Sequence, residues 1–233
     1  MTSLIAEAVK LLQANQAKKA EDLMKPYYQA NVNNDQFLHF YGLAASSSGD
    51  YASGIERLKK AITLNSRIAE YHHNLAAIYR LVGDFPLSEQ HYLTALNLKP
   101  DYAEAYFNYS AARKFTVDDP VIPILEQQLS RSDLSDPDRC FLGFAAGKIF
   151  NDIKDYDKAF LFYELGNRCK NAQFNIDQFR REIDQLISFF SAERIQQLSS
   201  LGLSSQVPVF IVGMPRTGTT LVEQILSSHP SIG

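Results

Sequence analysis

Residues 69–100 read AEYHHNLAAIYRLVGDFPLSEQHYLTALNLKP, and this stretch holds the pattern that decides the fold. Its turn, Gly83-Asp84-Phe85, repeats the earlier Gly49-Asp50-Tyr51 at a spacing of 34 residues. Ala61 recurs as Ala95 at the same spacing. A fixed period of this length is typical of stacked units that bury their hydrophobic faces only against their neighbours. We therefore expect an α-solenoid built from pairs of helices.

The residue types inside this repeat identify the kind of solenoid. Small residues at Ala76 and Ala95 stand where two helices must approach closely, and Tyr79 and Tyr92 fill the adjoining space. The Gly-Asp pair ends one helix and caps the next. With the period of 34, these features resemble the tetratricopeptide repeat family, which stacks antiparallel helix pairs. The resemblance is clearest over residues 35–102.

Three further repeats are more divergent. The first covers about residues 1–34, where Asn15 takes the place of the turn glycine because asparagine tolerates a positive φ. In the fourth, we expect one helix over residues 101–115 and a turn at residues 118–120. Pro123 then fits the first turn of the partner helix, since proline would break a helix interior.

The last repeat resumes the pattern at Asp155-Tyr156. Its first helix is expected to begin near Pro137 and its second to cover about residues 156–170. The sequence thus predicts about five repeats in a solenoid over residues 1–173, followed by capping and linker helices over 174–206. Residues 177–201 are expected to be helical, with an apolar face made by Phe179, Ile183, Leu186, Ile187 and Phe190.

Residues 207–233 have a different pattern. Val207–Val212 is an apolar, β-branched run that predicts a buried strand, and Thr219–Ser228 predicts a helix stopped by Pro230. The loop between them, residues 213–220, contains two glycines that let the backbone approach an anion. Because loop and helix N–H groups converge there, a strand, glycine loop and helix in this order favour phosphate binding.

The loop Pro215-Arg-Thr-Gly-Thr-Thr220 resembles the 5′-phosphosulfate loop of sulfotransferases that use 3′-phosphoadenosine 5′-phosphosulfate (PAPS). The resemblance is closer to the branch with arginine in this loop, which includes tyrosylprotein sulfotransferases and bacterial sulfotransferases fused to tetratricopeptide repeats. It implies that residues 207–233 open an α/β, P-loop-like domain. The glycine spacing also matches nucleotide triphosphatases, but Thr219 replaces their lysine, which disfavours nucleotide hydrolysis.

The resemblance implies roles for five loop residues. Arg216 would stabilise charge on the bridging oxygen as the sulfuryl group leaves, and Arg216, Thr217, Gly218, Thr219 and Thr220 would bind the co-substrate. The alternative is an arginine that only caps a structural loop. The resemblance requires no metal, and it places the catalytic base and the 3′-phosphate site beyond Gly233. We therefore expect the 233-residue chain by itself to be inactive.

A second candidate site lies in the repeat groove. Asn74 and Asn108 are 34 residues apart, and His73 occupies another groove position shared with His39. The asparagines resemble the ladder of the O-linked N-acetylglucosamine transferase repeats, in which side-chain amides bind a peptide backbone. Phe40 interrupts this ladder, and solvated asparagines are the open alternative. The histidines are too few and too far apart to predict a metal site.

Composition limits the other function classes. The 233-residue chain is 45% hydrophobic and carries a net charge of −3, so it lacks the basic footprint of a nucleic-acid-binding protein. No apolar run is long enough to span a membrane. Cys140 and Cys169 are too few for a disulfide framework and predict buried free thiols in a reducing compartment, the cytoplasm.

Two functions follow as expectations. The first is the amino-terminal part of a sulfotransferase that moves a sulfuryl group from PAPS to a hydroxyl or amine, with the repeats holding a peptide or protein acceptor. The second is a non-enzymatic tetratricopeptide adaptor for protein–protein interaction. Because a lone strand and helix cannot bury their own apolar faces, residues 207–233 need either a longer chain or a homodimer partner.

Overall fold

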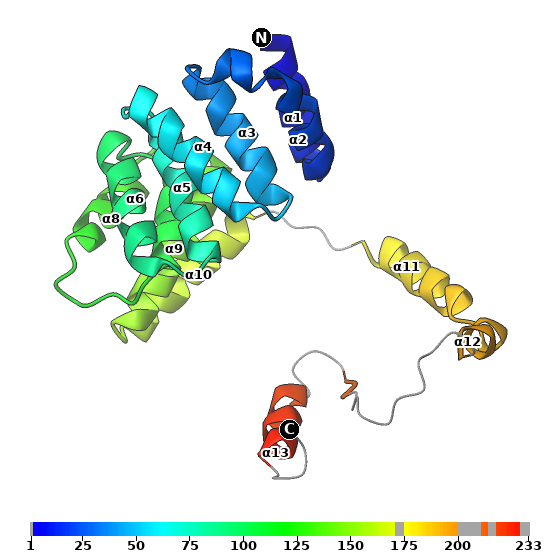
Figure 1. Ribbon diagram of the computed structural model, residues 1–233. Coiled ribbons are helices and arrows are strands. Elements are labelled where there is room, and N and C mark those ends of the chain that lie inside the picture. Colours follow the sequence, from blue (N-terminus) through cyan, green and yellow to red (C-terminus); the bar gives the residue numbers. More distant parts are fainter. Residues whose placement is uncertain (1, 171–174, 200–210, 214–217, 229–233) are drawn as a thin grey trace. The chain divides into compact units, whose positions relative to one another are not determined.

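The computed structural model describes residues 2–170, 175–199, 211–213 and 218–228. The chain divides into two compact units, Met1–Ala172 and Gln173–Gly233. Within the described residues there are thirteen α-helices, two short 3₁₀ segments and no strand. None of these helices has the length and hydropathy needed to cross a membrane. The predicted mainly α architecture is confirmed (Figure 1).

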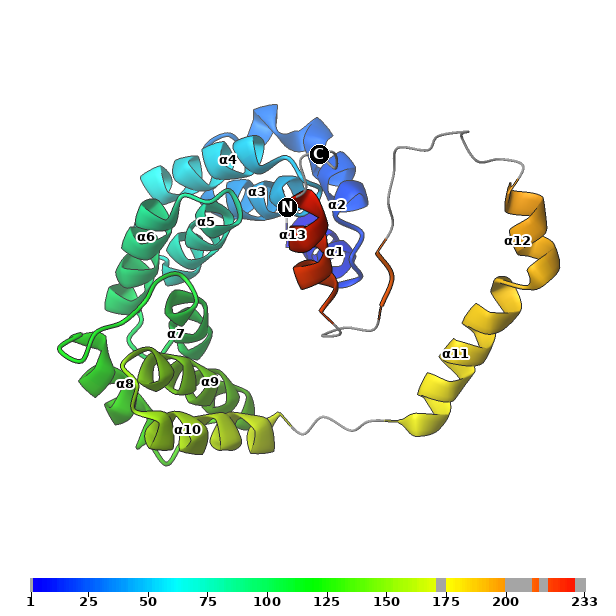
Figure 2. The same cartoon turned by 90° about the horizontal axis from the view of Figure 1, so that it is seen from below.

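The first unit contains ten α-helices that follow one another along the chain. They are α1 (Thr2–Gln13), α2 (Ala17–Met24), α3 (Asp35–Ser47), α4 (Tyr51–Leu64), α5 (Ala69–Leu81), α6 (Phe85–Leu98), α7 (Ala103–Ser110), α8 (Val121–Leu129), α9 (Asp136–Asp152) and α10 (Tyr156–Cys169), with 3₁₀ segments at Lys25–Tyr27 and Gln29–Asn31. Figure 2 shows α3, α5, α7 and α9 on the inner side of a curved stack and α4, α6, α8 and α10 on its outer side. This is the layout of a tetratricopeptide-type solenoid.

An aspartate caps the second helix of three repeats in the same way. Asp50, Asp84 and Asp155 have nearly identical backbone angles, with φ of −85 to −86° and ψ of 74 to 77°. Each carboxylate accepts a hydrogen bond from the backbone N–H three residues later, at 3.0 Å from Ser53, 3.2 Å from Leu87 and 3.2 Å from Lys158. The turn signal read from the sequence is therefore a true N-cap.

The residue before each turn aspartate has a left-handed backbone. Gly49 and Gly83 have φ of 98° and 83°, and Asn15 has φ of 58° at the equivalent place in the first repeat. The substitution of asparagine for the turn glycine is thus confirmed. Lys154 has φ of 66° in the last repeat, and this left-handed backbone is strained in a residue that has a Cβ. The repeat geometry holds even where its favoured residue is missing.

Small residues and buried tyrosines set the helix spacing. A Cβ built on Gly42 would lie 3.1 Å from the carbonyl oxygen of Gly54, so α3 and α4 touch through their backbones. Tyr79 and Tyr92 are 4% and 0% exposed, as expected for residues that fill the space between helices. Cys140 and Cys169 are free thiols, but they are half-buried rather than buried.

The fourth repeat differs from the prediction. The helix expected over residues 101–115 ends at Ser110, because side chains of α9 form hydrogen bonds with the backbone of the segment that follows. Lys148 of α9 donates a hydrogen bond to the carbonyl oxygen of Arg113, and the N–H of Phe115 donates to Asp152 at 3.1 Å. These backbone groups bond to side chains of α9 and therefore do not form the hydrogen bonds that would continue α7. Both α7 and α8 pack on α9.

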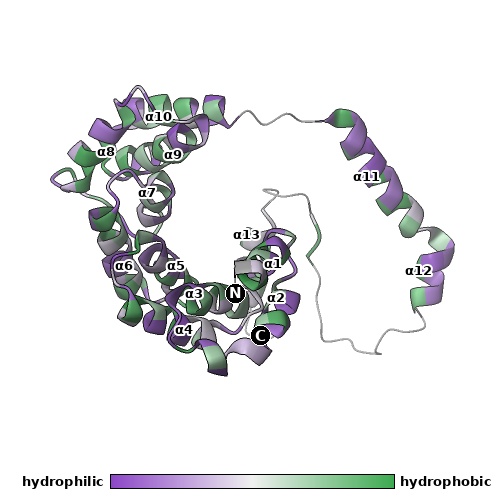
Figure 3. Cartoon of the chain, turned by 90° about the horizontal axis from the view of Figure 1, so that it is seen from above, coloured by the Kyte–Doolittle hydropathy of each residue, from purple (hydrophilic) through white to green (hydrophobic). Residues whose placement is uncertain are grey.

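The second unit contains α11 (Ile176–Phe189), α12 (Ala192–Ser199) and α13 (Thr219–Ser227). Both hydrophilic and hydrophobic residues line α11 and α12 (Figure 3), and the predicted apolar side chains Ile183 and Leu186 are 38% and 54% exposed. The expected capping role of these helices stays a prediction. Val207–Phe210 of the expected strand lies outside the described residues, and Ile211–Gly213 has no regular structure.

Candidate functional site

Two histidine–asparagine pairs link the inner helices of the first unit. Nδ2 of Asn74 on α5 lies 2.8 Å from Nε2 of His39 on α3. Nδ2 of Asn108 on α7 lies 2.9 Å from Nε2 of His73 on α5. Because an amide nitrogen only donates, Nε2 accepts in both pairs, and each imidazole carries its proton on Nδ1. One contact thus recurs from one repeat to the next.

The second nitrogen of His73 is also occupied. Its Nδ1 lies 3.0 Å from the hydroxyl oxygen of Tyr102, and the ring packs against Tyr92 and Tyr102. His73 is only 4% exposed. The sequence predicts that His73 is a partner-binding residue. Its burial and its two hydrogen bonds instead suit a positioning residue, which holds Asn108 in place.

Burial keeps both histidines of the pairs neutral. Desolvation lowers the pKa of His39 to about 4 and that of His73 to about 4, and the nearby carboxylate of Glu70 opposes this shift only in part. At neutral pH both rings therefore remain hydrogen-bond acceptors at Nε2. The orientation of each asparagine amide is fixed by a ring that does not change charge near pH 7.

The asparagine amides keep unused hydrogen-bonding capacity. Each Nδ2 has a second hydrogen, and neither Oδ1 has a partner within residues 2–170. Asn74 and Asn108 are both half-buried. Each of two successive inner helices thus offers one donor and one acceptor, which is the pair of groups that a peptide unit requires. The sequence pointed to both asparagines and to His73, but it did not reveal that histidines hold the asparagines, although both pairs share a 35-residue spacing.

The other histidines of the solenoid point elsewhere. Nδ1 of His72 lies 3.0 Å from Nδ1 of His91 on α6, whereas the ring nitrogens of His73 lie against Tyr102 and Asn108, so the two adjacent histidines have different hydrogen-bond partners. In the part of the chain that the structure describes, no three His, Cys, Asp or Glu side chains come together as a metal site would require.

The second candidate site is only partly described. Arg216 and Thr217 lie outside the described residues, so their expected roles stay predictions. Gly218 precedes α13 with φ of 86°, a left-handed conformation that favours glycine. Thr219 and Thr220 form the first turn of α13, and among the described residues no side chain caps this end of the helix. A helix start of this kind favours binding of an anion by its first-turn N–H groups.

Comparison with known proteins gives separate matches for the two units. Residues 208–233 match the model of the Sulfotransferase family. An uncharacterised protein of Aquifex aeolicus is 37% identical over 116 residues, which is 49% of this chain and 15% of that protein. Photosystem I assembly protein Ycf3 of Synechococcus elongatus is 27% identical over 99 residues, or 40% of this chain and 57% of Ycf3. The matches thus span only part of each relative's length.

Solved structures resemble the repeats. The crystal structure of MamA covers 70% of this chain and 94% of its own, with 20% identity and a TM-score of 0.52. A kinesin light chain protein of Podospora anserina with nearly identical TPR-like repeats covers 72% and 94%, with 15% identity and a TM-score of 0.57. At these identities the likeness shows the fold alone. Residues 2–170 thus form a tetratricopeptide-type α-solenoid, and residues 208–233 of the same chain match the Sulfotransferase family.

Proposed function

We propose that the solenoid binds an extended peptide segment of a protein partner along its inner helices. The repeated histidine–asparagine contact carries this proposal. Asn74 and Asn108 occupy equivalent places on α5 and α7, and each leaves an acceptor and a donor for a ligand. Side-chain amides that serve backbone groups recognise an extended chain without reading its side chains.

We further propose that the protein transfers a sulfuryl group from PAPS to a hydroxyl or amine on the bound partner. The match of residues 208–233 to the Sulfotransferase family supports this second step. Gly218 and the uncapped first turn of α13 suit an anion, and Arg216 would supply positive charge where charge develops on the leaving oxygen. In this proposal the repeats bind the acceptor, and the loop at residues 213–220 binds the sulfuryl donor PAPS.

A peptide selection tests the binding step. A random peptide library is selected on the immobilised protein, and recovered peptides are measured against wild type and the double variant Asn74→Ala/Asn108→Ala. Losing two hydrogen bonds should weaken binding by about tenfold. Methylation of single backbone nitrogens should weaken binding as well, whereas alanine substitution at the same peptide positions should be tolerated.

The matched control is Asn97→Ala, which removes an exposed asparagine from the outer helix α6. This variant should bind the selected peptides like wild type. If the double variant also binds them like wild type, the inner-helix asparagines are solvated side chains and the proposal is wrong. A fully adaptor-like protein would bind the peptides but would not transfer sulfuryl groups.

A further inference from the structure

A cavity of about 400 Å³ lies between α6, α7 and α8, and α6 and α8 are outer helices of the stack (Figure 2). It forms where the chain leaves α7 early and crosses to α8 through residues 111–120. The cavity is separate from the histidine–asparagine pairs, which share none of its lining residues. Its walls are formed by Glu89, Leu93, Leu96, Asn97, Pro100, Tyr106, Tyr109, Arg113, Asp119, Pro120, Val121 and Ile124.

The body of the cavity is apolar. Tyr106 and Tyr109 from α7 are 2% and 1% exposed and form buried wall. Leu93 of α6 and Ile124 of α8 remain 39% and 43% exposed at the rim, although both are large aliphatic side chains. A volume of this size falls in the range of roughly 300–1,000 Å³ that small-molecule sites occupy. The walls therefore suit a compact hydrophobic group.

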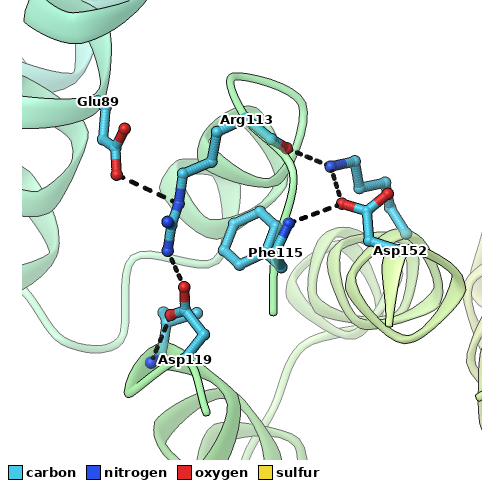
Figure 4. Close-up of polar contacts among 7 residues, drawn as sticks. Glu89, Arg113, Phe115, Asp119 and Asp152 are labelled. Carbon is cyan, nitrogen blue, oxygen red and sulfur yellow. Dashed lines mark hydrogen bonds and ion pairs between the residues drawn. The ribbon is translucent and has the colours of Figure 1, made fainter. Parts of the chain in front are cut away.

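One end of the cavity carries an ionic cluster that joins Glu89 of α6 to Arg113 and Asp119 of the segment 111–120 (Figure 4). Nε of Arg113 lies 3.2 Å from Oε1 of Glu89 on α6. The guanidinium also donates to Oδ2 of Asp119, whose other oxygen accepts from the N–H of Val121 at 3.1 Å. The side chain of Asp119 is 5% exposed, whereas that of Glu89 is 35% exposed. Asp119 is thus held inside, and Glu89 faces the opening.

The charges of this cluster do not balance. Glu89, Arg113 and Asp119 are the charged side chains in the wall, and two carboxylates face one guanidinium. The surplus is one negative charge, located at the more exposed carboxylate of Glu89. A group of opposite charge placed there would gain a charge-assisted hydrogen bond, while an anion would be repelled by the net negative charge of the cluster.

We propose that this cavity binds a small ligand that joins an apolar body to a primary ammonium group. The body lies between Leu93, Tyr106 and Ile124, and the ammonium pairs with Glu89. This site is independent of the peptide surface on the inner helices. A ligand here would contact α6, α7 and α8 together, and so would stabilise the fourth repeat, where the helix pairing is least regular.

Three matched probes test the site on the full chain: 4-phenylbutylamine, 4-phenylbutanol and 4-phenylbutyrate. Binding is measured by titration, and shifts of the methyl NMR signals of Leu93 and Ile124 show whether the probe binds in the cavity. The amine should bind about fivefold more tightly than the alcohol, and the carboxylate most weakly. Tighter binding of the carboxylate, or no shift of either methyl signal with any probe, would overturn the proposal.

Two variants separate the ammonium contact from the apolar one. Glu89→Gln should abolish the preference for the amine while leaving the alcohol unchanged, and Ile124→Ser should weaken all three probes. Glu164→Gln on α10 removes an equal charge outside the cavity and should change nothing. Thermal unfolding checks that each variant is folded. A preference for the amine that survives Glu89→Gln also contradicts the proposal.

Discussion

Nδ2 of Asn108 lies 2.9 Å from Nε2 of His73, and the same contact joins Asn74 to His39 one repeat earlier at 2.8 Å. A buried, neutral imidazole thereby fixes the orientation of an amide on the next inner helix. In the proposed peptide site, the unused oxygen of that amide would be preorganised for the ligand, which would reduce the entropy lost on binding. In this proposed site, the histidines act through the asparagines rather than by contact with a partner.

The positioning role of His73 predicts a graded effect of substitution. His73→Leu removes the acceptor for Asn108 and the partner of Tyr102, and should lower the free energy of unfolding by about 2 kcal/mol. His73→Gln keeps a polar partner and should recover part of this loss. Urea unfolding measures both, and peptide binding should follow the same order. Equal stability of the two variants would contradict the role.

The depressed pKa values of His39 and His73 predict acid sensitivity. An unfolded histidine has a pKa near 6.5, whereas each of these has a pKa of about 4 in the folded protein. Below pH 6.5 the unfolded chain takes up protons that the folded protein does not. The free energy of unfolding should therefore fall between pH 7 and pH 5, by about 2 kcal/mol per histidine.

Urea unfolding at several pH values checks this slope. The double variant His39→Gln/His73→Gln lacks both titrating groups and should show a shallower decrease over the same range. An NMR titration of the imidazole signals gives a direct test. If either ring titrates near pH 6.5 in the folded protein, the explanation by burial is wrong.

The strained turn before Asp155 offers a stabilising substitution. Lys154 has φ of 66°, and a left-handed conformation costs a residue with a Cβ about 1 kcal/mol. Lys154→Gly should therefore raise the free energy of unfolding by about 1 kcal/mol, less the entropy that glycine adds to the unfolded chain. Asn15→Gly is the matched control at φ of 58° and should gain less, because asparagine tolerates this conformation. Equal increases in the free energy of unfolding at both sites would contradict the explanation by backbone strain at Lys154.

The close backbone contact between α3 and α4 predicts that a substitution at Gly54 is destabilising. A Cβ on Gly54 would lie 2.9 Å from Cβ of Ser46 and 3.0 Å from the carbonyl oxygen of Gly42. Gly54→Ala should lower the free energy of unfolding by about 1–2 kcal/mol, even though alanine favours helix. Lys59→Ala on an exposed position of α4 should change it by less than about 0.5 kcal/mol. A more stable Gly54→Ala protein would show that the helices can separate.

The repeats were predictable because their signals are local. A glycine or asparagine with positive φ, an aspartate cap and small residues at close approaches act within a few residues of one another. Asn15, Gly83 and Asp84 illustrate this, since each has the backbone or contact that its residue type predicts. The helix at Thr219–Ser227 was predicted for the same reason.

The features that sequence analysis missed depend on distant partners. Residues 111–115 have no local signal that stops a helix, and the hydrogen bonds that Lys148 and Asp152 make with this segment come from α9. The cavity beside Arg113 is a consequence of that interruption. The roles of His39 and His73 also required the three-dimensional contact, because a histidine on an inner helix has the same pattern whether it binds a partner or holds an asparagine.

In the proposed function, the repeats hold an acceptor for a sulfuryl transfer in which Arg216 acts. The natural gene product is incubated with radiolabelled PAPS and a hydroxyl-containing peptide selected on the repeats, and label on the peptide is counted. We predict transfer that falls at least about 100-fold in Arg216→Ala. In Asn74→Ala/Asn108→Ala transfer should fall while PAPS binding is kept. Absence of PAPS binding, or transfer unchanged by Arg216→Ala, would contradict the proposed sulfuryl transfer, and only the proposed peptide binding by the solenoid would remain.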